Sequence, residues 1–197
     1  PVKAIIITAI PAAIGASATQ LNVFISGNLS SFIEGGRTWL ATADRLYQLP
    51  LGLVGVAIGI ALLPRLSSAV ASDDRARQQA AMDEALVLAM ALTLPAAAAL
   101  MAMPHFLIDA LFTRGAFLAV DAENTARVLF QFGWGVPAFV LIRILAPAFF
   151  ARGDTRTPMA FALVSVAVNA ALAVGLFYGG LGVPGIAAAV SAAAWTN

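Results

Sequence analysis

The chain has 197 residues, of which 61% are hydrophobic and 11% are charged, and its mean hydropathy is +0.91. The 11 Lys and Arg residues nearly cancel the 10 Asp and Glu residues, which argues against a nucleic-acid partner because no basic field would hold the backbone. Cys is absent and there is one His, so we expect no disulfide, no metal site, no cofactor and no enzyme.

Long apolar stretches separate the charged clusters. Residues 4–33, 46–64, 85–108 and 157–197 carry no charged side chain, and about 20 apolar residues suffice to cross a bilayer. We therefore predict an all-α, polytopic membrane helix bundle with about six spans. The first residue is not Met and the last lies within a predicted helix, so we expect a piece truncated at both ends. The helices are expected at residues 3–33, 42–68, 79–103, 122–151, 157–178 and from 184 onward.

The first predicted helix carries a polar stripe. Thr19, Asn22, Ser26 and Ser30 are spaced 3, 4 and 4 residues apart, so they lie on one helix face. Such a stripe does not face hydrocarbon. It either forms hydrogen bonds to neighbouring helices or lines a water-filled cavity.

Asp44 and Arg45 stand at the head of the second predicted helix, followed by Gln48 and a series of glycines. Gly55 and Gly59 form the small-residue pattern that lets two membrane helices approach closely. The planar guanidinium of Arg45 suits phosphate oxygens, and the adjacent carboxylate could orient it. The charged pair could equally be an interfacial anchor for the helix end.

Two later helices carry isolated polar residues. Arg143 needs a cavity, a carboxylate partner or a route for its head to the cytoplasmic interface. Pro137, earlier in the same predicted helix, removes one hydrogen bond and is expected to bend it. Ser165 and Asn169 are four residues apart and form a small polar face, which favours contacts between helices.

Two connections between helices have distinctive sequences. Residues 105–117 intersperse Phe and Leu with charged side chains, which predicts either a short helix in the membrane interface or an ordinary loop. The run of glycines and proline at 179–185 predicts a tight turn and therefore two antiparallel neighbouring helices.

Lys and Arg residues near the span ends favour one orientation. With Lys3 in the cytoplasm, the loops at 67–79 and 151–157 are cytoplasmic and the loop at 34–37 is periplasmic. The arginines then divide into Arg65, Arg75, Arg77, Arg152 and Arg156 inside, and Arg37, Arg45, Arg114 and Arg127 outside.

The stretch ADRLYQLPLGLVGVAIGIALLPRLS at 43–67 resembles the signature of the MurJ/MviN lipid II flippases. Three further segments agree with that family in order and spacing: TQLNVFISGNLSSFI at 19–33, LFTRGAF at 111–117 and LAPAFFARGDTRTP at 145–158. The family belongs to the multidrug/oligosaccharidyl-lipid/polysaccharide (MOP) exporter superfamily. Its fold has fourteen helices in two lobes, and these segments resemble the seventh to the twelfth.

This resemblance implies that residues 1–197 are part of a transporter transmembrane domain whose N-terminal lobe is missing. The implied activity moves lipid II, an undecaprenyl-pyrophosphate-linked disaccharide-pentapeptide, from the inner to the outer leaflet of the bacterial cytoplasmic membrane by alternating access. The implied partners are lipid II, membrane lipids and the missing lobe. The alternative is another exporter of the superfamily, a polysaccharide-repeat flippase or a drug/cation antiporter.

The resemblance also implies site residues. Arg45, beside Asp44, is expected to meet the pyrophosphate together with arginines of the missing lobe. Some relatives carry a sodium site built partly from carboxylates, and no acidic residue stands at the corresponding helices here, so no metal is expected. The expected cavity-lining residues are Thr19, Asn22, Ser26, Gln48, Arg143 and Asn169.

Overall fold

The computed structural model describes residues 20–71, 75–151 and 154–197, and this part of the chain is helical and contains no strand. Thr19, the first residue of the predicted polar stripe, lies outside the described residues. The elements are a helix at 20–30, α2 (Gly36–Ala71), α3 (Arg75–Ala102), α4 (Pro104–Phe112), α5 (Ala119–Gly133), α6 (Val136–Ala151), α7 (Arg156–Leu176), the π-helical turn η1 (Phe177–Leu181) and α8 (Gly182–Thr196).

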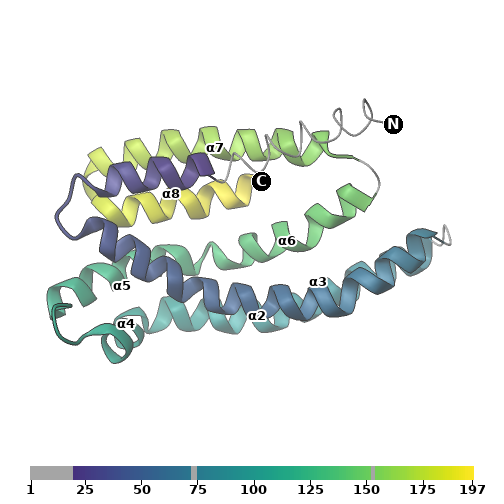
Figure 1. Ribbon diagram of the computed structural model, residues 1–197, viewed down its shortest axis with the longest axis horizontal. Coiled ribbons are helices and arrows are strands. Elements are labelled where there is room, and N and C mark those ends of the chain that lie inside the picture. Colours follow the sequence, from purple (N-terminus) through teal and green to yellow (C-terminus); the bar gives the residue numbers. More distant parts are fainter. Residues whose placement is uncertain (1–19, 72–74, 152–153) are drawn as a thin grey trace.

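The helices form two groups (Figure 1). The helix at 20–30 lies alongside α7 and α8, where Leu29 packs against Ala173, Ile186 and Ala189. The long helix α2 packs with α3, α5 and α6 around a second and larger apolar core. Large apolar side chains are exposed on the outside of both groups, as expected for helices that face lipid.

The second helix begins at Gly36, six residues before the predicted start at 42. A compact turn precedes it, in which Gly35 has a positive φ of 77° and the Gly36 N–H donates to the Ile33 carbonyl. This first turn opens with the polar residues Arg37 and Thr38, and Trp39 and Leu40 are too short an apolar run to mark a membrane helix. α2 therefore extends well beyond its apolar segment, and Asp44 lies two turns inside it.

The single helix predicted at 122–151 is two helices, and this prediction was wrong. α5 ends at Gly133, α6 begins at Val136, and their axes are bent by 44°. Pro137 is the second residue of α6, a position at which its missing N–H costs nothing, whereas inside one continuous helix it would remove a bond. The break lies just before Pro137, as expected because proline is tolerated at the start of a helix and disfavoured inside one.

Both distinctive connections form as compact elements. Residues 104–112 form α4, with proline at its first position, so this segment is a helix and not an ordinary loop. After α7 the chain reverses at Gly180 and Gly182, whose φ values are 99° and 57°. α7 and α8 are antiparallel neighbours, as predicted, since Ser165 contacts Ala193 near one end of the pair and an ideal Cβ on Gly185 would lie 3.0 Å from Leu176 near the other.

Within the described residues, two stretches are long and apolar enough to cross a membrane: Arg75–Ala102 and Arg156–Thr196. The second stretch contains both antiparallel helices α7 and α8. The bent pair of α5 and α6 becomes a third candidate if it is counted as one span. The number six for the spans stays a prediction.

Candidate binding cavity

A cavity of about 520 Å³ lies between the two helix groups. It is bordered by the helix at 20–30 and by α2, α5, α6, α7 and α8. Its charged lining consists of two guanidinium groups and one carboxylate, so the cavity favours anionic groups. The polar lining residues are Asn22, Ser26, Ser30, Arg37, Asp44, Tyr47, Arg143, Ser165 and Asn197.

The polar stripe on the helix at 20–30 both lines this cavity and forms a hydrogen bond to a neighbouring helix. Asn22 and Ser26 line the cavity, and the side-chain oxygen of Asn22 also accepts a hydrogen bond of 2.9 Å from the Nδ2 of Asn169 on α7. Asn169 is fully buried and lies behind the lining. Its Oδ1 and the Oγ of Ser26 are buried without a hydrogen-bond partner. Both oxygens are neutral, and the one carboxylate side chain among the described lining residues of the cavity belongs to Asp44 on α2.

Asp44 lines the cavity and is held in place by two neighbours on α2. The Nε2 of Gln48, one turn later, donates a hydrogen bond to its Oδ2, and the hydroxyl of Tyr47 also forms a hydrogen bond with its carboxylate. The ring of Tyr47 packs against Phe132 and Phe139, with centroid distances of 4.6 and 5.3 Å. The packed rings hold Tyr47, and the hydroxyl of Tyr47 in turn holds the Asp44 carboxylate.

Arg45 points away from this cavity. Consecutive helical residues are about 100° apart, so when Asp44 lines the cavity its neighbour faces another side of α2. The Arg45 side chain is exposed and forms no ion pair with any residue that the structure describes. Gln48 is also exposed and does not line the cavity; its role is to hold Asp44.

Arg143 reaches from α6 to α2, where its Nη1 lies against Gly55. A Cβ added at Gly55 would lie 3.4 Å from this nitrogen, so the glycine leaves room for the guanidinium. The sequence allowed Arg143 to line a cavity, to pair with a carboxylate or to reach the cytoplasmic interface. In the structure Arg143 lines the cavity, and no carboxylate pairs with it in the described part of the chain. The side-chain surroundings of Gly59 lie outside the described residues.

Arg37 and Tyr47 also line the cavity, although neither was predicted from the sequence to do so. A signal for Arg37 was present, because Arg37, Asp44 and Leu51 are spaced seven residues apart and therefore share one helix face. The same signal covers Tyr47, which stands three residues after Asp44 and four before Leu51 and therefore shares this helix face.

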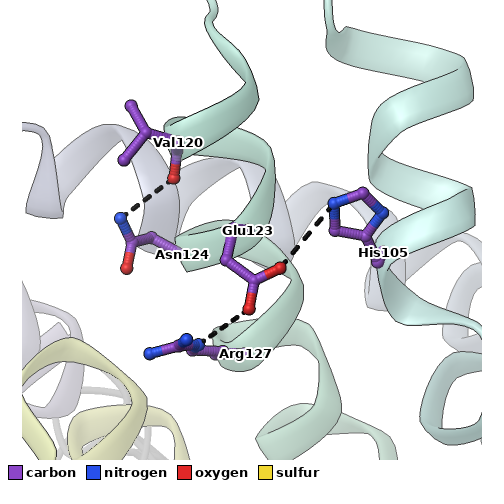
Figure 2. A network of polar contacts seen from close by, with 5 residues as sticks. All are labelled: His105, Val120, Glu123, Asn124 and Arg127. Atoms are coloured by element: carbon purple, nitrogen blue, oxygen red, sulfur yellow. Dashed lines mark hydrogen bonds and ion pairs between the residues drawn. The ribbon is translucent and has the colours of Figure 1, made fainter.

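A second polar cluster lies on the surface between α4 and α5 (Figure 2). Arg127 donates a hydrogen bond of 3.0 Å to Glu123, whose other oxygen lies 3.7 Å from the Nε2 of His105. Asn124 donates to the carbonyl of Val120. The charged side chains are at least half exposed, and no group of His, Asp and Glu suited to a metal ion occurs among the described residues. This cluster ties α4 to α5 at the surface.

The whole chain, residues 1–197, matches the family model described as lipid II flippase MurJ. A probable lipid II flippase MurJ of Rhizobium meliloti (strain 1021) is 44% identical over 196 residues, which are 100% of this chain and 36% of that relative. The probable lipid II flippase MurJ of Rickettsia prowazekii (strain Madrid E) is 39% identical, over 100% of this chain and 38% of the relative. The chain thus spans little more than a third of these relatives.

Solved structures agree with the helix arrangement. A lipid II flippase MurJ in an inward closed conformation matches with a TM-score of 0.83 and 25% identity, over 94% of this chain and 39% of that chain. A MOP superfamily transporter from Pyrococcus furiosus matches with a TM-score of 0.72 over 98% of this chain and 42% of that chain, and at 22% identity it shows the fold alone. The predicted all-α, exporter-type membrane fold is confirmed. Because the family model matches every residue, the chain belongs to the lipid II flippase MurJ family of polytopic membrane proteins.

Proposed function

We propose that this chain is part of a transporter that moves lipid II from the inner to the outer leaflet of the bacterial cytoplasmic membrane by alternating access. The observation that carries the proposal is the match of the whole chain to the lipid II flippase family. A cavity with two guanidinium groups and one carboxylate supports it, because the pyrophosphate of lipid II is the anionic part of that substrate. A flippase breaks no covalent bond, so no catalytic residue is required.

Arg45 is our candidate for the residue that recognises the pyrophosphate. Its guanidinium is exposed and forms no salt bridge with any residue that the structure describes, so its donors can reach an anion. Arg45 follows Asp44 in α2 but faces another side of the helix, so in this conformation it lies outside the cavity described above. Asp44 serves as the fixed charge before it in the chain, and Arg37 and Arg143 are the two cations of the cavity.

The remaining wall of the substrate site would come from another part of the same protein. The matched relatives are almost three times as long as the segment they share with this chain, which leaves room for a second lobe. The partners of the segment are then lipid II, the surrounding lipids and that lobe. A drug/cation antiporter or a polysaccharide-repeat flippase of the same superfamily is not favoured, since the 44% and 39% identical relatives are named lipid II flippases.

The test uses a full-length flippase that carries this segment, in cells depleted of their own flippase. Arg45→Ala should abolish growth while the amount of protein in the membrane stays near normal, because an exposed arginine contributes little packing. Arg45→Lys should support growth only partly, since an ammonium keeps the charge and loses the bidentate fork. Asp44→Asn should be milder than Arg45→Ala, because an amide oxygen still accepts from Gln48. Normal growth with Arg45→Ala would contradict the assignment.

A further inference from the structure

The break between α5 and α6 releases backbone carbonyls that a continuous helix would use. At the break, the Gly135 N–H donates to the Phe132 carbonyl three residues back, at 2.9 Å, and not to Gln131 four residues back. The Gln131 carbonyl has therefore lost its helical donor. In a membrane protein such a group must find another donor, because hydrocarbon supplies none.

α8 supplies the missing donors from the side. The Oγ of Ser191 donates to the Gln131 carbonyl at 2.7 Å, and the Nε1 of Trp195 donates to the Trp134 carbonyl at 3.2 Å. Ser191 is fully buried. A Cβ at Gly135 would overlap the Ser191 side chain, so the glycine allows α8 to approach this closely. The two donors lie one helical turn apart on α8, and both bond to carbonyls at the break.

The bend decides where Arg143 stands. Eight helical residues separate Gly135 from Arg143, or about 12 Å at 1.5 Å per residue. Straightening the 44° bend would move the Arg143 backbone by about 9 Å, enough to take its guanidinium away from Gly55. The position of this cation in the cavity therefore depends on bonds made by another helix.

We propose that Ser191 is a positioning residue, which holds the bend between α5 and α6 through the Gln131 carbonyl and so places Arg143 in the cavity wall. Trp195 assists at the next turn. Without the Ser191 hydroxyl, the Gly135 N–H can return to the Gln131 carbonyl, which reduces the bend, while Pro137, which has no N–H for the Gly133 carbonyl, keeps part of it. The use of Arg143 in transport rests on the proposed function, but the effect of Ser191 on the bend does not.

The bend is measured by pulsed electron paramagnetic resonance between spin labels at Leu53 on α2 and Phe150 on α6, both exposed, in a full-length flippase that has no other Cys. Phe150 lies 15 residues, or about 22 Å, beyond Gly135, so full straightening would move its backbone by about 17 Å. Ser191→Ala should shift the distance between the labels by about 4 Å or more, a quarter of that displacement. Trp195→Phe, a milder change at a half-exposed ring, should shift it in the same direction by less. Ser165→Ala is the matched control, because its hydroxyl donates a similar bond to Ala193 of α8, away from the break.

An unchanged distance in Ser191→Ala and in Trp195→Phe would overturn the proposal, as would an equal shift in Ser165→Ala. Lipid II transport is measured on the wild-type, Ser191→Ala and Trp195→Phe samples, whereas Ser165→Ala serves as a control for the distance alone because Ser165 lines the cavity. Where the distance shifts, Arg143→Ala should cause no further loss of transport in the Ser191→Ala background, since the cation is already displaced. A shifted distance with full transport would support the role of Ser191 in the bend and would count against Arg143 in the proposed function.

Discussion

Trp39 and Asp121 join the start of α2 to the start of α5. The Nε1 of Trp39 donates to one carboxylate oxygen of Asp121 at 2.8 Å, and the other oxygen accepts the backbone N–H of Leu118 at 2.9 Å. One carboxylate therefore caps the first turn of α5 and anchors it to a residue 82 positions earlier in the chain.

Asp121→Ala should lower the melting temperature of the protein, because both donors lose their acceptor. Asp121→Asn should lower it less, since one amide oxygen can still accept. Glu123→Ala is a control from the same helix, whose carboxylate contacts only exposed side chains. Melting of Asp121→Ala at the temperature of Glu123→Ala would show that the contact adds no stability.

At the scale of single residues, the sequence predicted the types of side chain in the cavity better than their directions. The spacing of Asn22 and Ser26 was enough to place them on one polar face, and both line the cavity. For Asp44 and Arg45 the sequence could not say which one faces inward, because only the packing of Tyr47 against α5 and α6 decides the rotation of α2.

The start of α7 is shaped by Asp154, in the loop before the helix. Its Oδ1 accepts the backbone N–H groups of Arg156 and Thr157 at 3.1 and 3.0 Å. Hydrogen bonds from the side chain and then the backbone of Thr157 lower the pKa of Asp154 below its ordinary value of 3.8. A carboxylate whose pKa is lowered on folding stabilises the fold above its ordinary pKa, and this contribution is lost as the pH falls through the folded value.

Asp154→Ala should therefore be less stable than the unchanged protein at neutral pH, and the difference should shrink as the pH falls below about 4. Thermal unfolding in detergent between pH 3 and 7 measures this gap. A gap that stays constant over the whole range would mean that the charge of Asp154 does not stabilise α7.

The helix at 20–30 is tied to α7 by the bond between Asn22 and Asn169. A double-mutant cycle with Asn22→Ala and Asn169→Ala should give a coupling free energy of about 0.5–1.5 kcal/mol, the usual range for a hydrogen bond between membrane helices. Additive losses of stability would show that the two amides act independently.

At the scale of helices, apolar length predicted which segments are helical but not where they break. The segment at 122–151 looked like one helix because Phe, Val and Leu continue across Gly133 and Gly135. Pro137 marked a bend in the sequence, but the hydrogen bonds that Ser191 and Trp195, about 60 residues away, donate to carbonyls at the break could not be predicted from it.

For the whole molecule, the charge bias predicts that residues 34–37 face the periplasm and 151–157 the cytoplasm. A Cys at Glu34, an exposed turn residue, should react with a membrane-impermeant maleimide added to intact cells. A Cys at Asp154 should react only after the inner membrane is permeabilised. The chain itself has no Cys, so each probe within it gives a single signal. The reverse pattern would invert the orientation.

The family fold could be predicted from the sequence because four sequence segments lie in the family order. The cavity could not be predicted in this way. Its walls come from six helices, and its two cations, Arg37 and Arg143, lie more than 100 residues apart in the sequence. Only the packed structure brings them to one space.

Translocation of lipid II by purified full-length protein in vesicles tests most directly whether this segment contributes Arg45 to the transport of lipid II. Wild-type protein and Arg127→Ala, an exposed arginine paired only with Glu123, should translocate at equal rates. Arg45→Ala should show no translocation above empty vesicles, and Arg45→Lys a partial rate. Translocation by Arg45→Ala at the rate of Arg127→Ala would contradict the account.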